Sequence, residues 1–288
     1  MEERLGETLP ADLAPVSGMV RSLLDSGGKR LRPALTIFAS KFHPPAGEKV
    51  VALAAAVEML HTATLVHDDM IDNSLVRRGS PTLNAAWDDD GGVLVGDYLF
   101  ARAAALAAET ENPLIISLFS RTLMLICSGE LREALGMTKP NREDYYQRIS
   151  KKTASLFAAA TEGGALLSGA KEEEVRALRS YGHNLGLAFQ IMDDILDFIG
   201  DEEELGKPIG SDLRQEVITL PVLYFLEETP DWGNVERILK GGEEIEEHIS
   251  SLVAMIRGSG AIRSSQAEAQ AFTQRAKEAI SLLPHNRY

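Results

Sequence analysis

The apolar run VVALAAAVEMLHTATLV, residues 50–66, leads directly into three aspartates, Asp68, Asp69 and Asp72. Its Ala and Leu content and the spacing of its apolar residues predict a helix from about Lys49 to Asn73. Such a helix is apolar enough to enter a protein core, yet it ends in carboxylates. Carboxylates are costly to bury unless they are paired or bound to a cation, so this helix end needs a cationic partner.

The three carboxylates and one histidine share a side of this predicted helix. A helix turns about 100° per residue, so Asp68 and Asp72 lie within about 40° of each other and Asp69 flanks them. His61, seven residues before Asp68, falls on nearly the same stripe. The predicted helix therefore has an apolar body and an acidic end.

The same pattern recurs in FQIMDDILDF, where Asp193, Asp194 and Asp197 repeat the spacing and Gln190 precedes them by one turn. A single D-D-x-x-D motif is explained as well by an acidic helix end or a solvated face as by a functional site. Two such motifs, each within an apolar helical run, favour a shared chemical role.

Helix-favouring residues with apolar positions at three- and four-residue spacing dominate the rest of the chain. Gly, Pro, Asn and Asp clusters break it into about a dozen helices of ordinary length. None of these breaks resembles a long linker and no repeat of fixed period is visible. The sequence therefore predicts an all-α protein with one domain over residues 1–288.

Composition limits the partners and the setting. A net charge of −14 disfavours nucleic acid as a partner, because phosphate binding requires a basic surface. Cys127 is the only cysteine, and the first residues lack the features of a signal peptide. No uninterrupted apolar run reaches about 18 residues, so we expect no membrane span and a cytoplasmic protein.

The two acidic motifs predict a magnesium site. Six carboxylates facing one another would repel and raise each other's pKa unless cations lay between them. Oxygen ligands without His or Cys suit Mg²⁺, which completes its shell with water and phosphate oxygens. The pair of motifs therefore favours a clamp for Mg²⁺ and a diphosphate. A calcium buffer is a weaker reading, because the EF-hand loop spacing is absent.

Short basic clusters lie near the acidic motifs, although each alone could be a solvated surface feature. Arg offers a planar fork for phosphate and Lys a point charge. The clusters are GGKRLRP with Lys29, Arg30 and Arg32; RRGSPT with Arg77 and Arg78; KKTASLFAAA, a predicted helix opened by Lys151, Lys152 and Thr153; and GKPIGSD with Lys207.

In this order and spacing, GGKRLRP, HTATLVHDDMIDNSLVRRGSPT, KKTASLF, FQIMDDILDF and GKPIGSDLRQEVITLP resemble the trans-isoprenyl diphosphate synthases, or polyprenyl synthetases. The resemblance runs from about Gly27 to Pro221. It implies an isoprenoid synthase fold, with about a dozen helices around a central apolar cavity, in a polyprenyl synthetase domain that is usually a homodimer.

The resemblance also implies a Mg²⁺-dependent prenyltransferase that joins isopentenyl diphosphate head to tail, in trans, to an allylic diphosphate. The six aspartates would hold three Mg²⁺ ions per active site. Lys152 and Lys207 would take part in catalysis, and contact with a membrane would be transient, for product release. The residues implied to support the allylic substrate are Arg77, Lys152, Thr153, Gln190 and Lys207, and those implied to bind isopentenyl diphosphate are Lys29, Arg32, His61 and Arg78.

Product length in this family depends on residues about one turn before the first motif, here Ala63 and Thr64, with Leu60 a turn deeper. Small residues there favour a medium or long product of roughly six to eight isoprene units by this resemblance. A short-chain farnesyl or geranylgeranyl diphosphate synthase is the alternative.

Two further alternatives differ in the partner or the reaction. The chain could be the catalytic subunit of a heterodimeric synthase, since both of its metal motifs are intact. A class I terpene cyclase is less well supported, because its second motif is ordinarily of an Asn-Ser-Glu type. One departure from the family pattern is Glu216-Val217, where relatives commonly have Gly-Lys.

Overall fold

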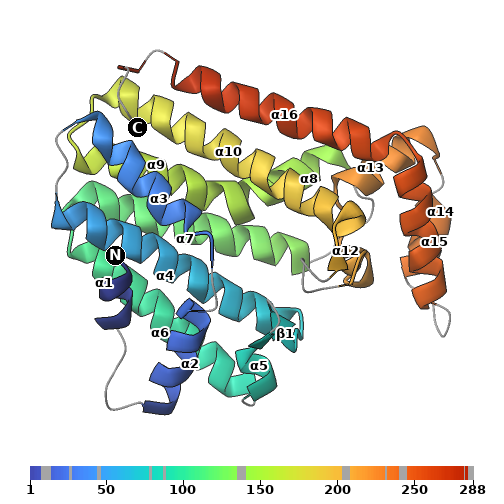
Figure 1. Ribbon diagram of the computed structural model, residues 1–288, viewed down its shortest axis with the longest axis horizontal. Coiled ribbons are helices and arrows are strands. Elements are labelled where there is room, and N and C mark those ends of the chain that lie inside the picture. The colour runs from blue at the N-terminus through green and yellow to red at the C-terminus, as the bar shows by residue number, and fades with distance from the viewer. Residues whose placement is uncertain are drawn as a thin grey trace. The chain divides into compact units, whose positions relative to one another are not determined.

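The computed structural model is built almost entirely of helices, which confirms the all-α prediction (Figure 1). Within the described residues the exception is a short antiparallel ribbon, β1 (Val76–Arg77) and β2 (Ser80–Pro81). The structure describes residues 1–7, 14–25, 28–43, 47–77, 80–86, 89–134, 141–202, 208–230, 232–239, 245–281 and 283–284.

The chain divides into two compact units. Unit 1 comprises residues 1–125, 155–183 and 277–288, and unit 2 comprises residues 126–154 and 184–276. The helical elements are α1 (Glu2–Glu7), α2 (Ala14–Asp25), α3 (Leu31–Ala39), η1 (Ser40–Phe42), α4 (Glu48–Ile71), α5 (Leu83–Ala86), α6 (Asp89–Ala108), α7 (Pro113–Ala134), α8 (Arg142–Ile149), η2 (Ser150–Ala154), α9 (Ser155–Leu167), α10 (Glu172–Ile199), α12 (Ser211–Arg214), α13 (Leu220–Glu228), α14 (Trp232–Leu239), α15 (Ile245–Gly258) and α16 (Ala261–Ala279).

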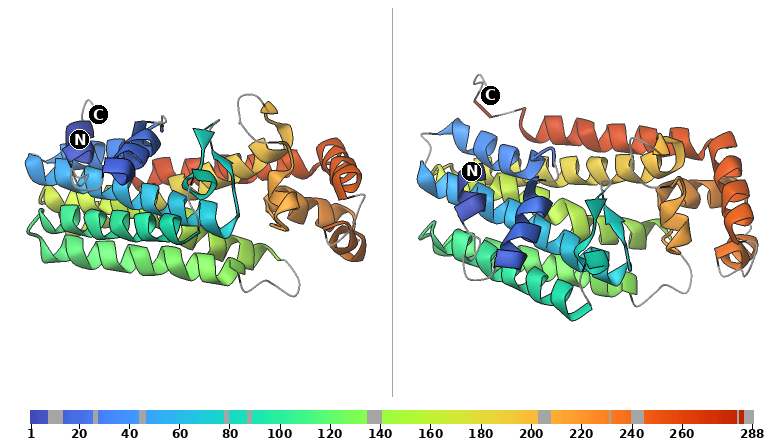
Figure 2. Two further views of the ribbon diagram at one scale, coloured as in Figure 1. Left: turned by 90° about the horizontal axis from the view of Figure 1, so that it is seen from below. Right: turned by 60° about the horizontal axis from the view of Figure 1, so that its bottom comes forward.

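Helix α4 is the central element of unit 1. It packs against α6, α3 and α9, and Figure 2 shows α4 and α6 side by side in both views. Nearly every residue from Ala52 to Leu60 is buried, so the helix is covered on all sides, as expected for a helix that is apolar all round. The predicted helix from Lys49 to Asn73 is thus confirmed to within two residues at each end.

Small residues let α9 approach its neighbours closely. A Cβ atom at Gly164 would lie 2.2 Å from the carbonyl oxygen of Thr36 and 3.1 Å from the Cβ of Ala39. Only a residue without a side chain fits there, because α3 presents its backbone at this point. Gly164 thereby fixes the contact between α3 and α9.

Unit 2 holds the last turns of α10 between two apolar clusters. Ile191 and Ile195 are fully buried in a cluster that also contains residues of α8, α13 and α16. Phe198, also fully buried, belongs to a second cluster with residues of α12, α13, α14 and α15. The apolar residues between the aspartates of the second motif therefore anchor that motif in unit 2.

The segment KKT lies in a different element from the one predicted. Lys151, Lys152 and Thr153 do not open a helix, because Arg142–Ile149, the π-helical turn Ser150–Ala154 and Ser155–Leu167 follow one another without a break. A π-turn inserts an extra residue into a helix and is frequent at functional sites. The sequence gives no period that would distinguish it from an ordinary helical turn.

Contrary to the expectation from the sequence, some segments are apolar and long enough to span a membrane. Among the described residues three helical stretches meet that length and composition, Glu48–Ile71, Gly91–Ala108 and Pro113–Glu133. The prediction counted uninterrupted runs, whereas average hydropathy tolerates a few polar residues. The most apolar window is 78% buried in α4 but only 39% and 28% buried in α6 and α7.

Candidate functional site

The first aspartate motif lies at the C-terminal end of α4, in unit 1. Asp68 is half-buried, Asp69 is only 3% exposed, and Asp72 is exposed at the C-cap. Asn73 adopts a left-handed conformation with φ of 49°, and the N–H groups of Asn73 and Ser74 donate to the carbonyls of Met70 and Asp69. This is a Schellman termination, in which Asn tolerates the positive φ.

The first motif therefore lies at the C-terminal end of α4, a position that favours a cation. The C-terminal end of a helix carries a partial negative charge, which adds to the charge of Asp68 and Asp72. His61 lies half-buried on the same helix, as the stripe predicted.

His67, directly before the motif, packs within unit 1. Its ring stacks on Phe100 with centroids 4.8 Å apart, and its Nε2 lies 3.4 Å from a carboxylate oxygen of Asp97. A Cβ at Gly96 would come within 2.4 Å of the imidazole. The imidazole ring is thus held against α6.

The second motif, in unit 2, places its three carboxylates in three different environments. Asp193 is exposed, whereas Asp194 and Asp197 are 3% and 1% exposed. One carboxylate oxygen of Asp197 accepts the backbone N–H of Asp212 at 3.1 Å, and its carbonyl accepts that of Gly210 at 2.8 Å. Asp197 therefore fastens the segment around α12 to α10.

Asp194 accepts hydrogen bonds on both carboxylate oxygens. The hydroxyl of Tyr145 donates to Oδ2 at 2.6 Å and the amide of Gln190 donates to Oδ1 at 2.8 Å. Thr153 in turn donates to the amide oxygen of Gln190 at 2.7 Å. Burial raises the pKa of Asp194, and these donors act against that rise by stabilising its charged form.

Lys152 and Thr153, both predicted to support the allylic substrate, come together in the π-turn η2. The Nζ of Lys152 lies 2.8 Å from a carboxylate oxygen of Glu130 and 3.1 Å from one of Glu133. Arg148 pairs with Glu133 at 3.2 Å. The predicted cation is thus held by two carboxylates of α7 in the structure.

The first basic cluster contains cations with distinct contacts in unit 1. Lys29 is exposed, and the guanidinium of Arg32 lies over the ring of Phe157, 4.5 Å from its centroid. Arg30 donates to buried Glu58 at 2.6 Å and also pairs with Glu2 at 3.1 Å. Arg30 therefore neutralises a carboxylate in the core.

Three predicted residues can be compared with the structure only in part. Arg78 and Lys207 lie outside the described residues. The backbone of Arg77 pairs with Ser80 in the β1–β2 ribbon, and nothing of its side chain is described.

The three predicted chain-length residues follow one another along α4. Leu60 and Ala63 are 1% and 0% exposed, so they are closely packed. Thr64 is half-buried, and its hydroxyl donates to the carbonyl of His61 at 2.8 Å. Of the three, Thr64 has the most accessible side chain.

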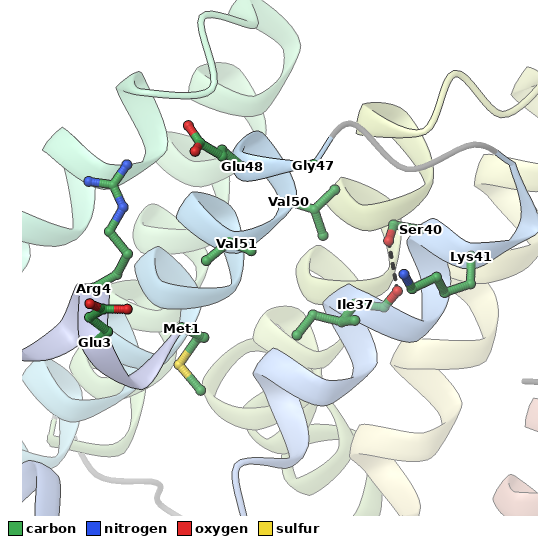
Figure 3. Close-up of a pocket in the computed structure, with 10 residues that line it drawn as sticks. All are labelled: Met1, Glu3, Arg4, Ile37, Ser40, Lys41, Gly47, Glu48, Val50 and Val51. Atoms are coloured by element: carbon green, nitrogen blue, oxygen red, sulfur yellow. Dashed lines mark hydrogen bonds between the residues drawn. The ribbon is translucent and has the colours of Figure 1, made fainter.

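A separate pocket of about 680 Å³ lies at the N-terminal end of α4 (Figure 3). Its lining combines apolar side chains of α3 and α4 with charged ones, including Arg4 and Lys41. Val51 in this pocket precedes Asp68 by 17 residues, which corresponds to about 25 Å along a helix. None of the predicted site residues lines it.

Sequence reasoning missed several residues that contact the predicted site. In unit 2, Tyr145 donates to Asp194, Glu130 and Glu133 pair with Lys152, and Arg148 pairs with Glu133. Tyr145 sits at an apolar position of its helix, where a tyrosine ordinarily signals packing alone. Its partner is 49 residues away in sequence, so no local pattern connects the two.

The carboxylates suit Mg²⁺ by the chemistry of their oxygens. Within the part of the chain that the structure describes, no three His, Cys, Asp or Glu side chains form a ready metal cage. Mg²⁺ ordinarily uses one or two carboxylates and takes its remaining ligands from water and phosphate. Asp68, Asp72 and Asp193, the accessible carboxylates of the motifs, fit that use.

Comparison with known proteins gives matches over nearly the whole chain. The sequence pattern of the polyprenyl synthetase family matches residues 14–256. Heptaprenyl diphosphate synthase component 2 of Geobacillus stearothermophilus is 38% identical over 289 residues, which cover 99% of this chain and 89% of that protein.

Two solved structures are similar in both sequence and fold. Polyprenyl synthase from Caulobacter crescentus, complexed with calcium and isoprenyl diphosphate, has a TM-score of 0.93 at 37% identity and covers 99% of this chain and 88% of its own. Heptaprenyl diphosphate synthase from Staphylococcus aureus has a TM-score of 0.94 at 35% identity and covers 99% and 91%.

Proposed function

The chain belongs to the polyprenyl synthetase family, and on this basis we propose that it condenses isopentenyl diphosphate with an allylic diphosphate into a medium- or long-chain polyprenyl diphosphate. It is a transferase of prenyl groups, and its isoprenoid synthase fold is the one predicted. The observation that carries the proposal is the repeated D-D-x-x-D motif, found in the last turns of two long helices, α4 and α10.

We propose Mg²⁺ as the cofactor, with three ions per active site as the family resemblance implies. Asp68, Asp72 and Asp193 are the carboxylates best exposed to bind it. Asp69 and Asp194 are buried and would act on the metal through the position of their neighbours. Mg²⁺ on a diphosphate would reduce its negative charge and make it a better leaving group.

The proposed reaction breaks the C–O bond of the allylic diphosphate, and the electron pair leaves with the diphosphate. The double bond of isopentenyl diphosphate supplies the electrons of the new C–C bond. A proton is then lost to the released diphosphate, and a double bond forms again. Cationic side chains support this step by stabilising the charge that develops on the leaving group.

Lys152 would bind the diphosphate from a position fixed by its two glutamates. The ammonium group has three donors, and Glu130 and Glu133 use two of them. The two ion pairs restrict where the ammonium group can lie. We therefore expect Lys152 to be oriented before the substrate arrives.

The product length is proposed as medium or long, because heptaprenyl diphosphate synthases are among the similar proteins and Ala63 and Thr64 are small. A short-chain product remains the alternative. One similar protein is named component 2 of its synthase, so a second subunit of another kind is the alternative to a homodimer.

A homodimer is proposed from apolar side chains left exposed in unit 1. Leu94 of α6 is 67% exposed, and Leu114 and Met124 of α7 are 60% and 64% exposed. Monomeric proteins seldom leave so many large apolar side chains uncovered on neighbouring elements. A second copy of the chain would cover them.

The test of the proposed function is incorporation of labelled isopentenyl diphosphate by the purified chain alone, with farnesyl diphosphate as primer and with Mg²⁺ added or chelated. Asp68→Ala and Asp193→Ala should each lower turnover by orders of magnitude while the circular dichroism spectrum stays helical. A near-normal rate in either variant would refute its metal role, and no product with any allylic primer would refute a synthase that acts alone.

Chromatographic sizing of the products tests the proposed chain length of the polyprenyl diphosphate. Ala63→Phe should shorten the product ladder if this turn of α4 limits growth. Because Ala63 has no exposed surface, Phe there also overpacks the core by about 1–3 kcal/mol. Thr64→Phe, at the more accessible position, is the companion variant, and an unchanged ladder in both would place the limit elsewhere.

A further inference from the structure

The buried hydroxyl of Tyr145 meets a buried carboxylate of the second motif. Tyr145 and Asp194 are each 3% exposed, and their side chains are 2.6 Å apart. Burial, and then the negative charge of Asp194, raise the pKa of Tyr145 well above its ordinary value. The phenol therefore keeps its proton at any working pH and acts as a donor to the carboxylate.

The other oxygen of Asp194 is engaged from the opposite direction along the chain. Gln190, one turn earlier on α10, donates to it, and Thr153 of the π-turn η2 orients the amide of Gln190. Asp194 is thus tied to α8 through Tyr145 and to η2 through Gln190. Each carboxylate oxygen of Asp194 therefore already accepts a hydrogen bond from a side chain of unit 2, and the carboxylate has almost no exposed surface.

Fixing Asp194 also fixes its neighbour. Adjacent residues of a helix point about 100° apart, so a turn of α10 that holds Asp194 inward directs Asp193 outward. Asp193 is indeed exposed. Arg148 reinforces the arrangement, because its guanidinium lies 5.6 Å from the ring centroid of Tyr145 and donates to the carbonyl of Ile218 at 2.8 Å.

We propose that Tyr145 is a positioning residue for the second aspartate motif: its hydroxyl holds Asp194 as an anchor, and this anchor aims Asp193 at the metal. The inference rests on the proposed function and assigns different roles to two adjacent aspartates. Asp193 binds the cation, and Asp194 serves as a hydrogen-bond acceptor within the protein.

The experiment measures Mg²⁺ affinity without turnover, by calorimetric titration in the presence of inorganic diphosphate, together with the Mg²⁺ dependence of the rate. Tyr145→Phe removes only the hydroxyl and should raise the Mg²⁺ concentration at half-saturation about tenfold or more, since it leaves a buried charged acceptor short of a donor. The rate at saturating Mg²⁺ should fall much less than the affinity.

The matched control is Tyr146→Phe, the same change at the next residue of α8. The ring of Tyr146 packs against Tyr145 and Phe272 and is only half-buried. Its loss of a hydroxyl should leave Mg²⁺ affinity within about twofold of the wild type. Equal Mg²⁺ affinities in the two variants would overturn the proposal.

A second pair of variants tests whether Asp194 is a hydrogen-bond acceptor within the protein or a metal ligand. Asp194→Asn keeps a group that can hydrogen-bond to a phenol and an amide, so it should retain most of the Mg²⁺ affinity, whereas Asp193→Asn should lose it. If Asp194→Asn lost as much affinity as Asp193→Asn, Asp194 would be a ligand and the anchor role would be wrong. A wild type without Mg²⁺-dependent activity would instead refute the proposed function, whatever the variants do.

Discussion

At the scale of single residues, the aspartates of the two D-D-x-x-D motifs differ in how far they are buried. The middle aspartate is buried in both motifs, as Asp69 and Asp194, while the first is more accessible in both. The last aspartate differs, since Asp72 is exposed at a helix end and Asp197 is buried beside α12. Carboxylates of one residue type therefore differ in their access to solvent, and we expect the accessible ones to bind the proposed metal.

Glu216 adopts a backbone conformation that carries an energetic cost. Its φ is 58°, in the left-handed region that costs a residue with a Cβ about 1–2 kcal/mol. Its side chain is exposed, so little packing would be lost by removing it. Glu216→Gly should raise the free energy of unfolding by about 0.5–1 kcal/mol, after the larger chain entropy of glycine is deducted.

Denaturant unfolding followed by circular dichroism measures this change. Glu216→Ala is the control, because alanine removes the charge but keeps the Cβ and should bring no such gain. A Glu216→Gly protein no more stable than Glu216→Ala would show that the left-handed backbone is not strained.

At the scale of elements, helix ends and one irregular turn organise the candidate site. Each motif occupies the last turns of a long helix, where the dipole favours a cation. The π-turn η2 brings Lys152 to two glutamates of α7 and Thr153 to Gln190 of α10. The backbone of Lys152 also lies 3.1 Å from where a Cβ of Gly129 would be, so α7 and η2 are in close contact.

The contact between α3 and α9 gives an element-scale prediction. Gly164→Ala should lower the free energy of unfolding by about 1–3 kcal/mol, because its methyl group would meet the backbone of Thr36. The better helix propensity of alanine offsets only part of this loss.

Gly18→Ala, in the middle of α2, is the matched control. A Cβ there meets nothing within 4 Å and the residue is exposed, so alanine should stabilise the protein by about 0.5–1 kcal/mol. Thermal or denaturant unfolding should shift the two variants in opposite directions, and a stabilised Gly164→Ala would mean that α3 can move away without cost.

At the scale of the whole molecule, the exposed apolar residues of α6 and α7 raise the question of assembly. These helices are apolar enough to be buried, yet less than half of the most apolar window of each is buried. The proposed second copy of the chain would cover Leu94 and Met124, and a measurement of the molecular mass in solution tests this.

The wild type should elute and scatter light at about twice the chain mass of 31.3 kDa. The double change Leu94→Glu and Met124→Glu should convert it to a monomer, because charges would be buried in the contact. Met255→Glu, at a 44% exposed methionine of α15, is the control and should stay dimeric. A wild type that is monomeric at micromolar concentration would contradict the proposed homodimer.

The sequence by itself determined the helical class, the span of α4 and the shared face of Asp68 and Asp72, because helical period and propensity are local properties. The sequence also identified the family, because the order and spacing of the basic and acidic motifs can be read directly from it. Both follow from neighbours that are close in sequence.

Only the tertiary structure decided which groups meet across the chain. Arg30 neutralises Glu58 from 28 positions away, and Tyr145 holds Asp194 from 49 positions away. A helical period states which side of a helix a residue occupies, but the partner on that side is set by how other helices pack against it. For the same reason, the sequence treated Asp193 and Asp194 as equivalent, and packing left one in solvent and buried the other.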